Sequence, residues 1–196
     1  LDAPAFLQLV RTRANDRVGD YLIAAAAGAG ESADLIYVPV RSGALGDVVP
    51  ASLKNGSDNF QVDALAVAEN GYVAVAIRLA GDSVGPSRLA FFNPLDRRVV
   101  MQMPSGLRNV VALAYSPKSG NLYAANAPAN DDSKAGIYRI DSATGGSTPA
   151  CKAVKVADIR HATALTFAAD NTLYVATLDS AKDSNSGTLV KLTGDL

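Results

Sequence analysis

The residues best suited to bind a ligand occur at matching places in two stretches of this 196-residue chain. The dipeptide Arg108-Asn109 begins five residues before Leu113, and Arg160-His161 begins five residues before Leu165. A guanidinium donates paired, coplanar hydrogen bonds to a carboxylate or a phosphate. We therefore interpret these four residues as candidates for binding an anionic group. The simpler alternative is that each arginine pairs with a nearby carboxylate or backbone carbonyl.

Acidic and amide side chains gather in two later polar segments. They are Asp131 and Asp132 in the first segment, and Asp179, Asp183 and Asn185 in the second. Residues 183–187 alternate oxygen-bearing side chains and end in Gly, as the start of a calcium loop does. The same residue types also form ordinary turns. We add Asp131 and Asp132 to the ligand-binding candidates, and take the second set as a candidate site for calcium or another divalent cation. No other cofactor is expected.

The scarcity of histidine and cysteine limits the reactions that the chain could catalyse. His161 is the only histidine and Cys151 the only cysteine, which excludes multi-histidine metal sites and an internal disulfide. A catalytic triad would need His161 beside a nucleophile. Cys151 lies ten residues away in no recognisable nucleophile motif, so we expect no triad.

The elements that must position these residues repeat about every fifty residues. Leu65, Leu113 and Leu165, spaced 48 and 52 residues apart, each lie in an apolar run that a turn joins to a second run. Third runs follow at 88–93, 136–141 and 187–192, fourth runs at 98–103 and 152–157, and an earlier, degenerate copy at 21–26 and 34–38. A fixed period of this length indicates repeated supersecondary units.

The repeated runs predict an all-β protein. Each run is short, rich in Val, Ile, Leu, Tyr and Phe, and bounded by turn residues, which is typical of strands, and little helix is expected. Four short antiparallel strands per unit predict a β-propeller of about four blades, with a β-sandwich as the alternative. The predicted units span about 14–60, 61–108, 109–160 and 161–196, in a single propeller domain or a propeller fragment.

The last predicted unit stops after its third strand. The apolar segment 5–11, which precedes the first unit, could supply the missing strand and close a small ring. Alternatively, the chain belongs to a larger ring, or two chains complete one ring by association, and we prefer this interpretation. The lack of an initiating Met favours a processed or excised piece.

The charge balance excludes one class of partner. Eighteen basic and nineteen acidic residues give a net charge of −1, without a long block of like charge, so we expect no binding of nucleic acid. The longest apolar stretch, 21–27, is much shorter than the roughly twenty residues that cross a membrane, so we expect no membrane span.

Residues 112–124, Ala-Leu-Ala-Tyr-Ser-Pro-Lys-Ser-Gly-Asn-Leu-Tyr-Ala, and the matching 164–176 carry a family resemblance. Over 61–192 the chain resembles bacterial propellers of the NHL and SMP-30/gluconolactonase-like kind. This resemblance implies a periplasmic or secreted bacterial protein. In a lactonase it would also imply a divalent cation held by Glu, Asn and Asp. The chain has only two glutamates, Glu31 and Glu69. Glu69 falls in a turn between first and second strands, which lies at the other end of the propeller channel from the candidate loops. We therefore assign no catalytic residue.

These observations favour a non-catalytic binding module. We expect the blade loops around one channel mouth to bind a protein, a peptide or a glycan, through the candidates named above. The alternative is a metal-dependent hydrolase or lactonase of the SMP-30-like type. Whether the chain is an enzyme stays open, with the binding module preferred.

Overall fold

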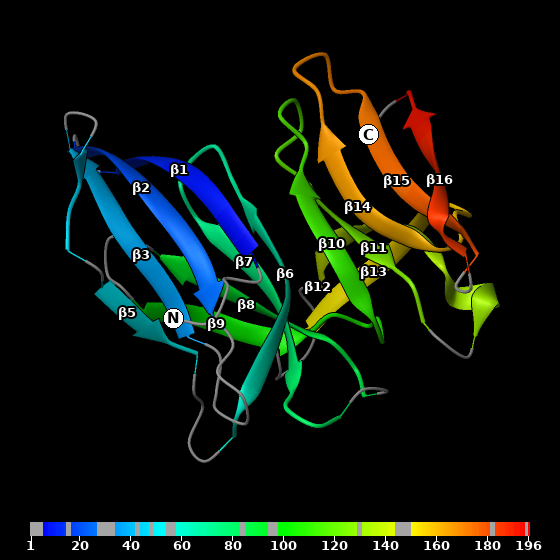
Figure 1. Cartoon of the computed structure of the whole chain (residues 1–196), viewed down its shortest axis with the longest axis horizontal. Helices are drawn as coiled ribbons and strands as arrows, with labels where there is room; N and C mark the ends of the chain where they lie inside the picture. Colours follow the sequence, from blue (N-terminus) through cyan, green and yellow to red (C-terminus); the bar gives the residue numbers. More distant parts are fainter. Residues whose placement is uncertain are drawn as a thin grey trace. The chain divides into compact units, whose positions relative to one another are not determined.

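The computed structural model divides the chain into two compact units (Figure 1). One contains Leu1–Ser83 and Leu89–Gln102, and the other contains Val84–Arg88 and Met103–Leu196. The structure describes residues 6–14, 17–26, 34–41, 44–47, 49–53, 58–82, 85–93, 98–128, 131–143, 150–180, 183–194 and 196. Each unit is described below by itself.

The first unit is built on two antiparallel sheets. The first sheet runs in the order β1 (Phe6–Ala14), β2 (Arg17–Ala26), β3 (Asp34–Arg41) and β4 (Ala44–Leu45), and β5 (Val49–Ser52) also pairs with β3. The second sheet runs in the order β6 (Phe60–Val67), β7 (Val73–Leu79), β8 (Arg88–Asn93) and β9 (Arg98–Pro104). The second sheet is a meander, because successive strands pair with one another; in the first sheet this holds for β1 to β4, while β5 pairs with β3 instead of with β4.

The second unit has the same plan. The third sheet consists of β10 (Val110–Tyr115), β11 (Leu122–Asn126), β12 (Gly136–Ala143) and β13 (Ala150–Ala157). The fourth sheet consists of β14 (Ala162–Phe167), β15 (Leu173–Ser180) and β16 (Asp183–Leu192). A single 3₁₀ turn, η1 (Asp132–Lys134), lies between β11 and β12 and is the one helical element of the described residues.

The predicted fold class is confirmed. The described residues form four antiparallel sheets of three to five strands, consistent with propeller blades. None of the helices found in these residues has the length and apolar character that crossing a membrane requires. The prediction that the chain is a single propeller domain stays a prediction.

The described part of the predicted closing segment 5–11 lies in β1. This strand pairs with β2 from Phe6 opposite Ala25 to Ala14 opposite Arg17. It therefore has the first place in its own sheet, as β6, β10 and β14 do in theirs. The first sheet begins at Phe6, earlier than residue 14, where we placed the first repeated unit.

The turn between the first and second strands has the same design in three sheets. Its central residue has a positive φ, which glycine adopts freely and asparagine tolerates: Gly71 at 85°, Gly120 at 69° and Asn171 at 66°. The side chain before it accepts a hydrogen bond from the N–H two residues further on. The pairs are Asn70 with Tyr72, Ser119 with Asn121, and Asp170 with Thr172. The sequence repeat is thus a repeat of local geometry.

The first strands also share a break in register at one place. The shift falls between Val62 and Ala64 in β6, between Val110 and Ala112 in β10, and between Ala162 and Ala164 in β14. Such an extra residue bends and twists the strand locally. The second strands β7 and β11 are buried on both faces, since residues 73–77 of β7 and every residue of β11 are buried. In β15, Leu173 and Val175 are buried, while Tyr174 and Ala176 on the other face are half-buried.

The core of the second unit lies between the third and fourth sheets. Tyr123, Ala125 and Ile137 of the third sheet pack with Leu165, Leu173 and Val175 of the fourth. The Tyr123 ring meets the Phe167 ring edge-on, with centroids 5.2 Å apart. Each sheet therefore depends on its neighbour to remove an apolar face from water.

We expect Leu173→Ala to lower the free energy of unfolding by about 2–5 kcal/mol, because the fully buried Leu173 would leave a cavity between two sheets. Leu79→Ala is the matched control: Leu79 is 44% exposed, so its truncation should cost no more than about 0.5 kcal/mol. Urea unfolding followed by circular dichroism measures both. Equal losses in the two variants would contradict the proposed core.

Candidate ligand-binding site

Four of the predicted binding residues lie at equivalent strand ends. Asn109 and His161 directly precede β10 and β14. Their carbonyls accept hydrogen bonds from Ala127 N at 2.9 Å and Leu178 N at 3.0 Å. These bonds extend both sheets by one residue in the same way, and β10 packs against β14. The fifty-residue period thus has a structural counterpart at the arginine-containing dipeptides.

The first unit has a comparable bond at the start of β6. The Asn59 carbonyl accepts a hydrogen bond from Ala80 N at 2.9 Å, one residue before β6. Counted from the repeated leucines Leu65 and Leu113, however, the residues that correspond to Arg108 and Asn109 are Phe60 and Gln61. Neither carries a charge, so the cationic pair is a feature of the second unit.

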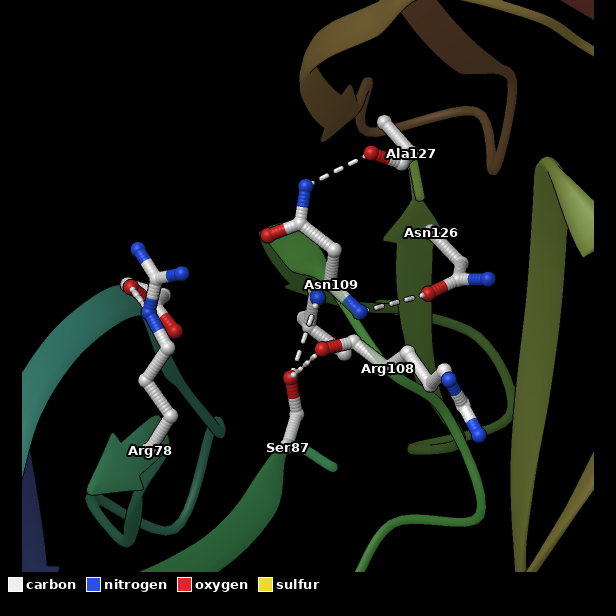
Figure 2. A network of polar contacts seen from close by, with 8 residues as sticks. Arg78, Ser87, Arg108, Asn109, Asn126 and Ala127 are labelled. Atoms are coloured by element: carbon white, nitrogen blue, oxygen red, sulfur yellow. Dashed lines mark hydrogen bonds and ion pairs between the residues drawn. The ribbon is translucent and has the colours of Figure 1, made fainter. Parts of the chain in front are cut away.

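Asn109 fixes two loops together. Its backbone N–H donates to Asn126 Oδ1 at 3.1 Å, and its side-chain Nδ2 donates to the Ala127 carbonyl at 2.6 Å (Figure 2). Asn126 is only 2% exposed, and its Nδ2 donates to the Lys134 carbonyl at 2.7 Å. Both amide side chains are therefore engaged within the protein, and Asn109 acts here as a positioning residue.

The loop between β11 and β12, which carries η1, is held from its own sheet. The Tyr138 hydroxyl donates to the Lys134 carbonyl at 2.9 Å. The Lys155 ammonium donates to the Ser133 carbonyl and to Asp158 Oδ1, both at 2.8 Å. Tyr138 lies on β12 and Lys155 on β13, and Asp158, which follows β13, holds the Lys155 ammonium in position. The bonds from Tyr138 and Lys155 hold the backbone of η1 in place.

Asp131 directly precedes η1, and neighbouring residues of the same segment bind its carboxylate. The Ser133 hydroxyl donates to Asp131 Oδ1, and the Lys134 ammonium lies 3.1 Å from Asp131 Oδ2. These two hydrogen bonds lower the pKa of the Asp131 carboxyl below its usual value. Asp131 is therefore ionised at neutral pH, and its charge is partly balanced by Lys134.

Arg160 and Asp132 meet at the surface. Arg160 Nη1 lies 3.6 Å from Asp132 Oδ2, and the two side chains are 69% and 54% exposed. This is the pairing with a loop carboxylate that we gave as the simpler alternative. An exposed ion pair of this kind contributes only about 0–1 kcal/mol. Both groups therefore remain available to a ligand.

Arg108 presents its guanidinium to solvent. Its side chain is exposed, and within the described ranges no hydrogen bond or ion pair joins that guanidinium to another residue. Figure 2 shows the Arg108 side chain extending away from Asn109 and Ser87. Its backbone carbonyl, in contrast, accepts a hydrogen bond from Ser87 Oγ at 3.1 Å. The backbone is anchored and the cation is free to bind.

Two buried serines provide that anchor. Ser87 Oγ also accepts a hydrogen bond from Val110 N at 3.2 Å (Figure 2), and Ser105 Oγ donates to the Ser87 carbonyl at 2.6 Å. Both serines are fully buried. Sequence analysis missed them, because nothing in their spacing distinguishes them from ordinary loop serines.

His161 has an uncommon backbone conformation. Its φ is 53°, in the left-handed region that non-glycine residues seldom adopt, while its side chain is exposed. Residues held in such conformations cluster at functional sites. Its conformation and the adjacent Arg160 mark this strand end as the more unusual of the two.

The candidate cation site lies on strands. Asp179 belongs to β15, and Asp183 and Asn185 belong to β16, which begins at Asp183 instead of at residue 187, where we placed the third apolar run. Their side chains, like Glu31, lie outside the described residues, so this cation site stays a prediction. Among the side chains that are described, no group of three or more His, Cys, Asp or Glu is placed to hold a metal ion.

Cys151 lies half-buried in β13. Burial raises the pKa of its thiol to about 11, and the thiolate is the nucleophilic form of cysteine. The environment thus disfavours the nucleophilic form of Cys151.

The first unit holds a buried ion pair that the sequence did not reveal. Arg78 Nε donates to Asp63 Oδ1 at 2.9 Å, and the Asp63 side chain is 7% exposed. Burial raises the pKa of Asp63, while Arg78 opposes the shift. Asp63 occupies the register shift of β6, whereas the equivalent residues Val111 and Thr163 carry no charge.

The fold and these strand ends define an all-β repeat protein of propeller-type blades with a polar, partly cationic loop surface. No family model matches the chain, and no curated protein matches it. A solved chain of Kuenenia stuttgartiensis hydrazine synthase aligns with a TM-score of 0.42 and 11% identity, over 96% of this chain and 62% of that one. A similarity at this level carries no functional argument, and this chain spans less than two thirds of that protein chain.

We expect Asn126→Ala to reduce the free energy of unfolding by about 1–3 kcal/mol, because the backbone N–H of Asn109 and the Lys134 carbonyl both lose their hydrogen bonds to the buried Asn126 side chain. Asn59→Ala is the control, since the Asn59 side chain is exposed and only its carbonyl extends a sheet. Urea unfolding compares the two variants. An unchanged stability for Asn126→Ala would show that this network does not hold the loops.

Proposed function

We propose that the chain is a non-catalytic binding module whose loops at the β10 and β14 ends bind an anionic group of a protein, peptide or glycan. The observation that carries the proposal is the pair of exposed guanidiniums, Arg108 and Arg160, at equivalent strand ends. Arginine suits this role because its planar fork matches a carboxylate or a phosphate.

The fixed backbone supports this function. Ser87, Asn109 and Asn126 hold the chain around Arg108 and the η1 loop before any ligand arrives. A binding surface that is already ordered avoids part of the entropy cost of ordering loops on binding. The side chains on these loops can therefore contribute more of their interaction energy to affinity.

The ion pair between Arg160 and Asp132 is suited to exchange. At 3.6 Å it is longer than the roughly 2.7–2.9 Å of a strong charge-assisted hydrogen bond. A ligand carboxylate can replace Asp132 beside Arg160 at little cost, and the released Asp132 can accept a hydroxyl or ammonium donor. The surface thus favours ligands that carry an anionic group next to a hydrogen-bond donor, as acidic peptides and acidic glycans do.

We expect Arg108→Ala/Arg160→Ala to weaken binding of an acidic probe by about tenfold or more, equivalent to about 1.4 kcal/mol. The probes are a tetraglutamate peptide and an oligogalacturonate, both labelled with fluorescein and measured by fluorescence anisotropy at about 0.15 M ionic strength, where remote charges are screened. Lys118→Ala/Lys152→Ala removes two exposed cations elsewhere and should change the affinity by less than about twofold. Equal losses in both double variants, or no binding of either probe, would contradict the proposal.

The alternative function, a metal-dependent hydrolase, is tested separately. A binding module of the proposed kind should show no specific shift of its unfolding midpoint when metal-stripped protein receives calcium, magnesium, manganese or zinc. A cation present at a free concentration of a hundred times its Kd would stabilise the fold by about 2.7 kcal/mol. A shift with one cation would favour the hydrolase and would justify a screen of lactone and ester substrates.

A further inference from the structure

The turn between β6 and β7 contains an asparagine that is followed directly by a glycine. Asn70 is exposed, and Gly71 has a φ of 85°. An asparagine before glycine is prone to lose its side-chain nitrogen, because glycine has no Cβ to keep its backbone N away from the preceding side chain. The equivalent turns of the third and fourth sheets have Ser119 and Asp170 at this place. Among these three turns, only the β6–β7 turn can undergo the reaction.

The reaction at Asn70 needs water and no other reagent. The backbone N of Gly71 attacks Cγ of Asn70 and forms a cyclic imide, while the bond from Cγ to Nδ2 breaks and Nδ2 leaves as ammonia with the Gly71 N–H proton. Water then opens the imide. Addition at Cγ gives aspartate, and addition at the backbone carbonyl of residue 70 gives isoaspartate. Both products add a negative charge beside the exposed Glu69.

In the folded turn, both reacting groups take part in other hydrogen bonds. Gly71 N donates to the Ala68 carbonyl at 2.9 Å, and Asn70 Oδ1 accepts from Tyr72 N at 3.1 Å. Ala68 N also donates to the Tyr72 carbonyl at 2.8 Å. The attacking nitrogen must give up the proton that it donates to Ala68, and the side chain must leave Tyr72. The reaction therefore requires the turn to open locally.

The fourth sheet shows that the same turn accommodates aspartate. Thr172 N donates to Asp170 Oδ1 at 2.9 Å. Asn171 N donates to the Ala168 carbonyl at 3.0 Å, and Ala168 N donates to the Thr172 carbonyl at 2.8 Å. The bond from Thr172 lowers the pKa of the Asp170 carboxyl below its usual value. An aspartate formed at position 70 can therefore keep all three bonds of the turn, whereas isoaspartate inserts a side-chain carbon into the backbone and disrupts them.

We propose that Asn70 is a site of deamidation which the closed β6–β7 turn restrains and whose aspartate product leaves the turn intact. The covalent state of Asn70 then records how often this turn opens. The inference is independent of the proposed anion binding, because residues 68–72 belong to the first unit and the two arginines to the second.

The test incubates the full chain at mildly alkaline pH, folded or unfolded in guanidinium chloride, and follows residue 70 by peptide mapping and mass spectrometry. In the unfolded chain, Asn70 should react about as fast as Asn55, which also precedes a glycine and lies outside the described residues. In the folded chain, Asn70 should react at least about tenfold more slowly than in the unfolded chain. Equal rates in the two conditions, or no reaction in the unfolded chain, would overturn the proposal.

Two variants test whether the turn tolerates the product. Asn70→Asp should keep the thermal unfolding midpoint of the wild-type chain, because the new carboxylate can accept the bond from Tyr72 as Asp170 does from Thr172. Asn70→Ser is the matched control: it places the residue of the third sheet in this turn, retains an acceptor and removes the reactive amide. A clear loss of the midpoint in Asn70→Asp but not in Asn70→Ser would overturn the claim that the aspartate product leaves the turn intact.

Discussion

A sheet of three to five strands in this protein cannot bury both of its own faces, and the remaining structure follows from that constraint. Each second strand is apolar on both sides and needs a neighbouring sheet to cover it. Tyr123 against Phe167, and Ile23 and Leu35 against Leu65, are solutions of the same packing problem. Because the sides of the sheets are used for packing, the strand ends are the places left for polar and charged groups.

The strand ends are organised by a few buried polar bonds. Carbonyls of Asn109 and His161 continue the sheet ladders, and Asn126 ties the η1 loop to the residue before β10. These bonds position the backbone and leave the guanidiniums of Arg108 and Arg160 at the surface. The buried amides and hydroxyls thus fix the backbone, and the exposed cations are the groups that a ligand can reach.

Much of the fold could be predicted from the sequence, because the periodic leucines and turn residues mark strands wherever the same packing recurs. Leu65, Leu113 and Leu165 all proved to lie on first strands. The buried bonds of Asn126, Ser87 and Asp63 could not be read in the same way. They join residues far apart in the chain, and a single asparagine or serine has no periodic signal. The start of β16 was missed because its Ser and Asn residues are more typical of turns than of strands.

Asn171 shows how a repeated turn can acquire a second task. It keeps the backbone conformation of the equivalent glycines, but its amide adds bonds that glycine cannot make. Ser116 Oγ donates to Asn171 Oδ1 at 2.6 Å, and Asn171 Nδ2 donates to the Leu196 carbonyl at 3.0 Å. The turn of the fourth sheet thereby links Ser116, which follows β10 of the third sheet, to Leu196. Separating the third and fourth sheets at this turn would break a buried hydrogen bond between side chains, which adds to the free energy of parting them.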